Sequence, residues 1–143
     1  RLCTQKPICK KLMLDHHQIL LDSKTIAVVG ASPNSARPSN WISKYLIAEG
    51  YPVIPVNPGH SELFGLKCYP DVESIDSEID IVNIFRRSDQ VIPIVESSLK
   101  KSALKLIWMQ DNVYNEEAAQ MVNSAGIPVV MNDCIYRVHR QIK

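Results

Sequence analysis

Short apolar runs alternate along this chain with stretches whose apolar residues recur at helical spacing. The runs lie at 25–30, 53–56, 79–85, 104–109 and 127–131, and the helical stretches at 12–22, 39–50, 91–101, 116–125 and 134–141. Continuous apolar runs of this length are typical of strands that are buried on both faces. Strands that alternate with helices form parallel sheets with right-handed crossovers. We therefore predict a Rossmann-like doubly wound parallel sheet in a three-layer α/β/α arrangement.

Length and composition favour one domain. The chain has 143 residues, of which 45% are hydrophobic and 22% charged, an ordinary globular mixture. We expect residues 1–11 to be a basic, loosely ordered tail and residues 12–143 to form the single domain. Proline cannot donate to a strand ladder, so Pro55 predicts that the strand at 53–56 lies near the sheet edge.

Charge and cysteine usage exclude several classes of partner. Sixteen Lys and Arg against fifteen Asp and Glu give a net charge of +1, which supports neither nucleic-acid nor membrane binding. No apolar run approaches the ~18 residues that a membrane span needs. The cysteines show no CxxC pair and no zinc spacing, which predicts reduced thiols and no metal. We expect a cytoplasmic protein, and the basic, acid-free first residues would also suit an organelle.

The turn after the first apolar run has the composition of an anion site. Gly30 and the small residues behind it lead into a helix, whose N-terminal N–H groups attract anions, usually phosphate. Arg37 places a cation close to that helix start. The full G-x-G-x-x-G pattern is absent, because serines stand at 32 and 35. A plain tight turn is the alternative interpretation.

Two further strands end in polar residues. Asn57 and Pro58 stand where an NAD-binding domain normally has an acidic residue for the ribose, and a neutral amide shifts weight towards NADP or coenzyme A. Asn-Pro also simply starts turns. Arg86 and Arg87 follow the third run, where guanidinium groups can pair with phosphate or stack on a base. The alternative is that one of them only caps a nearby carbonyl.

The fourth run and the C-terminal helix complete the set of candidate residues. Gln110 and Asn112 suit hydrogen bonding to an amide-bearing ligand, whereas we place Trp108 in the core. Cys134 and His139 are five residues apart, which leaves them off one another's helix face, so they form no obvious nucleophile–base pair. No catalytic constellation is visible, and a binding role is favoured over an enzymatic one.

Several segments together resemble the stand-alone coenzyme A-binding domain proteins, which are similar to the N-terminal domain of the succinyl-CoA synthetase α subunit. The segments are TIAVVGASPNSARPSNWISKYL, GYPVIPVNP, CYP, DIVNIFRRS, YNEEA and VVMNDCIYRVH, in that order. The resemblance covers roughly residues 12–142. It departs at Asp133, where the family often has arginine.

The resemblance implies a set of binding residues. Gly30, Ala31 and Ser32 would cradle phosphate with the help of Arg37; Val56, Asn57 and Pro58 would flank the nucleotide; Phe85, Arg86 and Arg87 would line the site; and Gln110 and Asn112 would lie near the pantetheine arm. The implied cofactor is coenzyme A or an acyl-CoA.

Our leading hypothesis is non-catalytic binding of coenzyme A or an acyl-CoA at the carboxyl edge of the sheet, as a carrier, a sensor or the partner of an enzyme. One alternative is a redox or thiol-linked protein in which Cys134 reacts with the CoA thiol. Another is an NADP-binding regulatory domain. The sheet edge would also serve as an interaction surface for a protein partner or a second copy of the chain.

Overall fold

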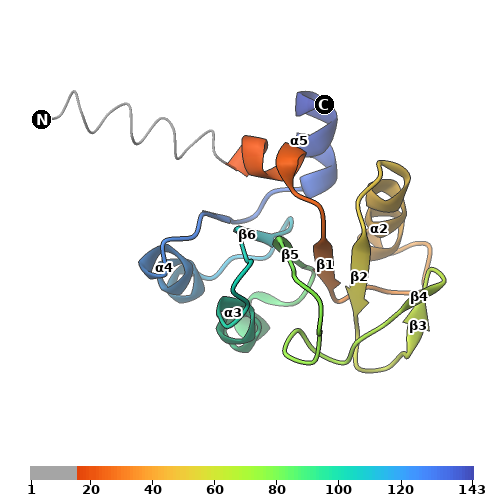
Figure 1. Cartoon of the computed structure of the whole chain (residues 1–143), viewed down its shortest axis with the longest axis horizontal. Coiled ribbons are helices and arrows are strands. Elements are labelled where there is room, and N and C mark those ends of the chain that lie inside the picture. The colour runs from red at the N-terminus through yellow and green to blue at the C-terminus, as the bar shows by residue number, and fades with distance from the viewer. Residues whose placement is uncertain (1–15) are drawn as a thin grey trace, which may run out of the picture.

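A five-stranded parallel sheet forms the centre of the computed structural model, which describes residues 16–143 (Figure 1). The strands are β1 (Ile26–Val29), β2 (Val53–Val56), β5 (Ile81–Ile84), β6 (Leu106–Met109) and β7 (Val129–Val130). Their order is β2-β1-β5-β6-β7, and each neighbouring pair is parallel. The predicted Rossmann-like fold is confirmed. The predicted tail at residues 1–11 lies outside the described residues.

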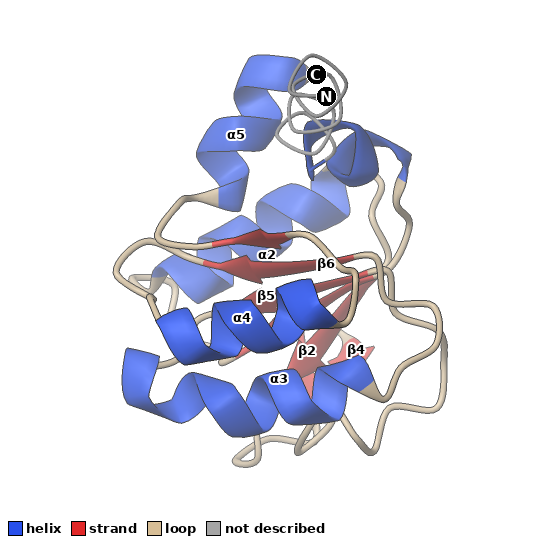
Figure 2. Ribbon diagram, turned by 90° about the vertical axis from the view of Figure 1, so that its left-hand side faces the viewer, coloured by secondary structure: helices blue, strands red, loops and turns tan. Residues whose placement is uncertain are grey.

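Helices connect the strands and cover both faces of the sheet. They are α2 (Pro38–Ala48), α3 (Val91–Leu99), α4 (Glu116–Ser124) and α5 (Ile135–Ile142), with a short 3-10 helix η1 (Ser88–Gln90) before α3. Residues 16–22 are also helical, and β3 (Glu62–Leu63) pairs with β4 (Leu66–Lys67) in a small antiparallel hairpin. Figure 2 shows α3 and α4 on one face of the sheet and α2 and α5 on the other.

The four longer strands explain the two cores. Every residue of β1, β5 and β6 is buried, and alternate residues of each strand point to opposite faces. Val28 and the predicted core residue Trp108 pack with Ile42 of α2 and Ile135 of α5. Met109 packs with the apolar sides of α3 and α4 on the other face.

Pro55 lies on the outer strand of the sheet, as its missing N–H predicts. The Gly30 N–H donates to the Val56 carbonyl at 2.9 Å, so the backbone polar groups of Val56 point towards β1. Those of its neighbour Pro55 point away from β1. On that outer side the Pro55 carbonyl accepts from the Tyr69 N–H at 3.0 Å, and Tyr69 forms an isolated parallel bridge with Val56. The absent donor therefore costs the sheet no ladder bond to β1.

The strand order places a crevice at the carboxyl ends of β1 and β5. From β1 the chain crosses to β2 on one side, and from β5 it crosses to β6 on the other. The connections that follow these two neighbouring strands therefore diverge, and open α/β sheets bind their ligands at such a point. None of the helices within residues 16–143 is long and apolar enough to span a bilayer.

A buried histidine joins the two helices on the α2/α5 face. His139 of α5 is 4% exposed, and its Nδ1 shares a hydrogen bond of 2.7 Å with the Tyr45 hydroxyl of α2. The Tyr51 ring packs edge-on against the same imidazole. Burial lowers the pKa of His139, because the charged imidazolium is poorly solvated there; nearby Glu49 acts in the opposite direction.

We expect His139 to make the folded state less stable in mild acid. An unfolded chain takes up this proton near pH ~6.5, whereas the folded chain takes it up only at lower pH. The free energy of unfolding should therefore fall as the pH drops from about 7.5 to about 5.5. Urea unfolding across this range measures the effect. His139→Gln should flatten the dependence, and His60→Gln, at an exposed position, should leave it unchanged. An unchanged slope in His139→Gln would contradict the assignment.

Candidate functional site

The turn after β1 approaches the end of β5 so closely that only glycine fits. Gly30 has a φ of +91°, and a Cβ at this position would lie 2.3 Å from the Phe85 carbonyl oxygen. No side chain can occupy that space without a shift of the backbone. The β1 turn and the β5 end thus form one continuous backbone surface at the crevice.

Side-chain hydrogen bonds fix the loop between Gly30 and α2. The Ser32 hydroxyl accepts from the Asn34 N–H at 3.1 Å, and the Asn34 amide oxygen accepts from the Ala36 N–H at 2.9 Å. Asn40 of α2 donates to the Ser32 carbonyl at 2.8 Å. Within residues 16–143, the backbone N–H groups of residues 31, 32 and 39 donate to no protein acceptor. Those of residues 32 and 39, which are not fully buried, are therefore available to an anion at the start of α2.

Asn57 ties the end of β2 to this loop. Its side-chain nitrogen donates to the Ala31 carbonyl at 2.8 Å, and its side-chain oxygen accepts from the Gly59 N–H at 2.8 Å. The second bond is the turn-forming contact that an Asn-Pro sequence favours. The amide thus fixes the mutual position of the β1 and β2 ends.

The structure separates the two arginines that follow β5. Arg86 lies at the crevice, where its Cδ is 3.3 Å from the position of a Cβ on Gly30. Arg87 precedes η1, and its largely exposed side chain lies 3.5 Å from the Asp89 carboxylate. Among the described residues, neither Arg86 nor Arg37 forms an ion pair. These two guanidinium groups can therefore accept an anionic ligand.

The residues after β6 hold the beginning of α5. Gln110 is 3% exposed, and its side-chain oxygen accepts from the Ile135 N–H at 2.9 Å. Asn112 has a φ of +68°, and its backbone N–H donates to the Asn132 side chain at 2.8 Å. At least one end of the Gln110 amide is thus used to cap α5.

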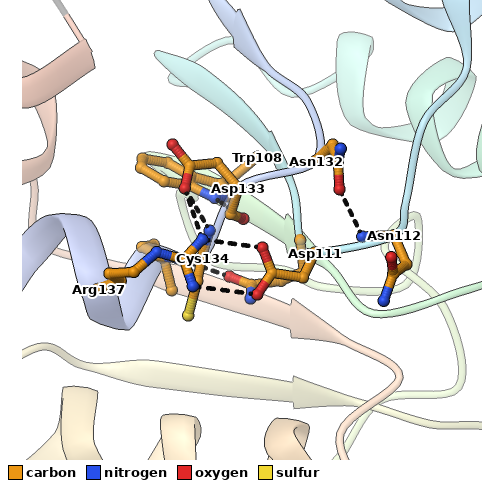
Figure 3. Close-up of polar contacts among 9 residues, drawn as sticks. Trp108, Asp111, Asn112, Asn132, Asp133, Cys134 and Arg137 are labelled. Atoms are coloured by element: carbon orange, nitrogen blue, oxygen red, sulfur yellow. Dashed lines mark hydrogen bonds and ion pairs between the residues drawn. The ribbon is translucent and has the colours of Figure 1, made fainter.

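Figure 3 shows an ion cluster beside this turn. The Arg137 guanidinium donates to both Asp111 carboxylate oxygens, at 3.0 and 3.3 Å, and to Asp133 at 3.0 Å. These hydrogen bonds, that to Asp111 first, raise the pKa of Arg137 further above its ordinary value. Buried Trp108 donates its indole N–H to the Asp133 carbonyl at 2.9 Å, so the cluster is anchored to the core.

Three adjoining hollows run along the carboxyl edge of the sheet. The central hollow, of about 370 Å³, is lined by Gly30, Ser32, Arg37, Pro38, Ser39, Asn57, Phe85, Arg86, Asp111 and Val113. The α3-side hollow, of about 240 Å³, shares Arg86 with it. The α5-side hollow, of about 430 Å³, shares Pro38, Phe85 and Asp111 with it.

Most residues that the sequence predicts for the site line these hollows. The predicted residues that line the central hollow are Gly30, Ser32, Arg37, Asn57, Phe85 and Arg86. Val56 and Pro58 line the α3-side hollow, and Gln110 and Asn112 line the α5-side hollow. Two predicted residues stand apart. Ala31 is fully buried, and Arg87 points away towards Asp89. Neither Ala31 nor Arg87 lines any of the three hollows.

Among the side chains of the α5-side hollow that sequence reasoning missed, four are aromatic or charged: Trp41, Asp111, Tyr136 and Arg137. Asp111 lies between two residues that were predicted, so its position in the turn was a usable signal. Trp41 and Tyr136 come from helices 95 positions apart in the chain, and their rings meet edge-on with centroids 5.0 Å apart. No local spacing in the sequence predicts that contact.

The two titratable residues that the sequence analysis weighed as a possible pair in the C-terminal helix lie in different places. His139 faces Tyr45 and Tyr51, whereas Cys134 lines the α5-side hollow, so the two do not form a nucleophile–base pair. No cluster of His, Cys, Asp or Glu within residues 16–143 is arranged to hold a metal ion. A larger hollow of about 680 Å³ borders β7 and His16, and it contains none of the predicted residues.

Comparison with known proteins gives consistent matches. A family model described as "CoA binding domain" matches residues 24–140. The uncharacterized protein YneT of Bacillus subtilis is 43% identical over 126 residues, which are 88% of this chain and 93% of that protein. The ADP-forming acetate–CoA ligase I of Archaeoglobus fulgidus is 27% identical over 128 residues, which are 83% of this chain and 19% of the ligase.

Solved structures show the same two kinds of relative. A hypothetical protein from Pyrococcus horikoshii OT3 is 42% identical with a TM-score of 0.85, and the match covers 90% of this chain and 89% of that one. The dinucleotide-forming acetyl-coenzyme A synthetase 1 of Ca. Korarchaeum cryptofilum, in complex with phosphate and ADP, is 30% identical with a TM-score of 0.70. That match covers 78% of this chain and 26% of the synthetase chain.

We expect Gly30→Ala to be far more damaging than the same change at another left-handed glycine. Gly126 has a φ of +79° with open space around a Cβ, so Gly126→Ala carries only the conformational cost, about 1–2 kcal/mol. Gly30→Ala adds the clash with the Phe85 carbonyl and should lower the free energy of unfolding by more than about 2 kcal/mol. Urea unfolding measures both. Equal losses would show that the turn moves freely away from β5.

Proposed function

The chain belongs to the CoA-binding domain family, and we propose that it binds coenzyme A or an acyl-CoA, without catalysis, along the carboxyl edge of its sheet. Its role would be that of a carrier, a sensor or the partner of a separate enzyme, in the cytoplasm. The observation that carries the proposal is the central hollow, where backbone N–H groups and two arginines without carboxylate partners in residues 16–143 surround one space.

The central hollow supplies what phosphate groups need. The start of α2 and the loop behind Gly30 offer backbone donors, and Arg37 and Arg86 offer positive charge. Charged hydrogen bonds of this kind are the stronger class in proteins. Phosphates are therefore assigned to the central hollow, held by these two arginines and the loop.

The flanking hollows suit the two ends of the molecule. The α3-side hollow is mostly apolar, with Pro58, Pro70, Val72, Pro93 and Ile94 in its lining. Such a surface suits the flat face of an adenine ring, and Arg86 stands at its border. The α5-side hollow offers the amides of Gln110 and Asn112, which suits the amide-bearing pantetheine arm.

The residues that line these spaces support a non-catalytic role. The described histidines line none of the three hollows, and the two aspartates that do, Asp71 and Asp111, already accept from the Ser74 N–H and from Arg137. A general base needs a free lone pair within reach of its substrate. The chain also matches only 19% of the length of the A. fulgidus ligase, so most of that enzyme has no counterpart in these residues.

NADP is the competing nucleotide. Asn57 provides no carboxylate that would repel a phosphorylated ribose, and its amide is already bonded at both ends. The α5-side hollow therefore distinguishes the two ligands, because a pantetheine arm would occupy it and a dinucleotide would not need it.

We expect Arg86→Ala to weaken CoA binding strongly, because it removes a charged partner of the phosphates. The loss of one charged hydrogen bond is about 1.5–3 kcal/mol, which corresponds to roughly 10- to 100-fold in Kd. Calorimetric titration of the folded protein with CoA, NADP and NAD measures the affinities, and thermal shifts give a second readout.

Arg87→Ala is the matched control for this experiment. It removes the same charge one residue away, from a side chain that lines none of the hollows, and should change the Kd for CoA by less than about threefold. Equal losses in the two variants would point to bulk charge in place of a site. Tighter binding of NADP than of CoA would replace the proposed ligand.

Cys134 supports a second candidate function, because its side chain lines the α5-side hollow. In this function the Cys134 thiolate attacks one sulfur of CoA disulfide, forms a protein–CoA mixed disulfide and releases one CoA thiol.

Mass spectrometry after incubation with CoA disulfide tests this candidate. We expect the adduct on Cys134 and not on Cys68, which lies outside the hollows and whose pKa is raised by burial. Cys134→Ser should abolish the adduct. Labelling of Cys68 at the same rate would show that the reaction is not directed by the site.

A further inference from the structure

We propose that the α5-side hollow receives the acyl end of a CoA thioester and selects uncharged, apolar acyl groups over acyl groups that end in a carboxylate. The inference rests on the proposed function, since it requires the pantetheine arm to enter this hollow. Two independent features carry it: an aromatic wall that is open to solvent, and a cation that is already engaged.

The wall of the hollow is aromatic and apolar. Trp41, Ile42, Phe85, Cys134 and Tyr136 all contribute to its lining. Trp41 is 42% exposed, which is a large apolar area to leave in water. An exposed aromatic surface next to a hollow is typical of a place where an apolar ligand binds.

The aromatic wall is held in place before any ligand arrives. The Tyr136 ring meets Trp41 edge-on at 5.0 Å and Tyr45 at 4.7 Å between centroids. Arg140 donates to the Tyr136 hydroxyl at 2.9 Å. Tyr136 is thus fixed between two helices, and the face of Trp41 that remains open is oriented by it. A preorganised wall loses little conformational freedom when a ligand packs on it.

The charge around the hollow opposes a second carboxylate. Arg137 is the only basic residue among the described residues that line it, and it binds both Asp111 and Asp133 (Figure 3). One guanidinium between two carboxylates leaves a net charge of −1. An acyl group that ends in a carboxylate would meet this negative cluster and find no unpaired cation among the described lining residues of the hollow, whereas Arg37 and Arg86 are assigned to the phosphates.

The engagement of Arg137 is built into the fold. Asp133 is fixed by four hydrogen bonds: its N–H donates to the Met109 carbonyl, its carbonyl accepts from the Trp108 indole, and its carboxylate accepts from the Cys134 N–H at 2.8 Å and from Arg137. Asp111 directly follows Gln110, whose side chain caps α5. Arg137 therefore lies between two carboxylates that the backbone holds in place.

Calorimetric titration with CoA, butyryl-CoA and succinyl-CoA tests the inference, because the last two acyl groups have four carbons each and differ in a terminal carboxylate. We expect butyryl-CoA to bind about tenfold more tightly than CoA, since the chain buries apolar surface against Trp41. Succinyl-CoA should bind at least about tenfold more weakly than butyryl-CoA. Equal binding of the two, or tighter binding of succinyl-CoA, would overturn the inference.

Two variants separate the aromatic and the electrostatic contributions. Trp41→Ala should reduce the preference for butyryl-CoA over CoA to less than about threefold. The double variant Asp111→Asn/Asp133→Asn releases Arg137. It should raise the affinity for succinyl-CoA relative to that for butyryl-CoA by at least about tenfold. Its control is Glu49→Gln/Glu73→Gln, which removes two carboxylates from ion pairs that lie away from the hollow and should leave the preference unchanged.

Tryptophan fluorescence gives a readout that does not depend on affinity. The chain has two tryptophans, and Trp108 is fully buried, so a change in emission on binding comes from Trp41. Butyryl-CoA should shift the emission to shorter wavelength more than CoA does, and Trp41→Ala should lack the shift. If none of the three ligands binds to the folded protein, the proposed function fails and this inference with it. If CoA binds but the three affinities agree within about twofold, only this inference fails.

Discussion

The need to cover both faces of a parallel sheet determines where chemistry can take place in this molecule. Strands β1, β5 and β6 are buried along their whole length, so their side chains must pack against helices. Polar groups that meet solvent are left to the strand ends. Because parallel strands end at the same edge, the loops of β1, β2, β5 and β6 converge there, and the three hollows form between them.

Amide side chains at this edge tie the loops together through hydrogen bonds. Asn57 joins the β1 and β2 ends, Gln110 holds the start of α5, and Asn115 bonds to the Ser88 carbonyl while it caps α4. Each tie spans segments distant in sequence. The candidate phosphate contacts are thus left to backbone N–H groups and to arginines, on loops whose positions are already fixed. Such preorganisation lowers the cost of ordering the site when a ligand binds.

The fold could be predicted because buried parallel strands carry an uninterrupted apolar signal. The run at 53–56 became β2 with the same bounds, whereas the run at 127–131 shortened to two residues, since the other edge strand, β7, pairs with β6 only at Val129 and Val130. Arg86 and Arg87 show the limit at the candidate site. Adjacent residues in extended chain point in opposite directions, and which of them faces the crevice depends on the turn that follows.

Contacts between distant segments could not be predicted, because they leave no pattern in the sequence. Asp111 and Arg137 lie 26 positions apart, and their pairing depends on how α5 docks against the turn after β6. The partner of the buried Trp108 indole N–H could not be predicted either, because it is a backbone carbonyl, and every residue has one. Side chains that bond to backbone groups can be anticipated locally, as at Asn115, but not across the fold.

The orientation of Pro55 has a consequence for how the molecule behaves among its own copies. An edge strand normally presents a row of open N–H and carbonyl groups that can recruit a strand from another chain. Here Pro55 has no hydrogen to donate outward, its carbonyl already accepts from the Tyr69 N–H, and the Asn57 N–H donates to the Tyr69 carbonyl. The end of β2 around Pro55 therefore offers no template for strand addition, which shortens the edge that another chain could pair with, without a charged residue within β2.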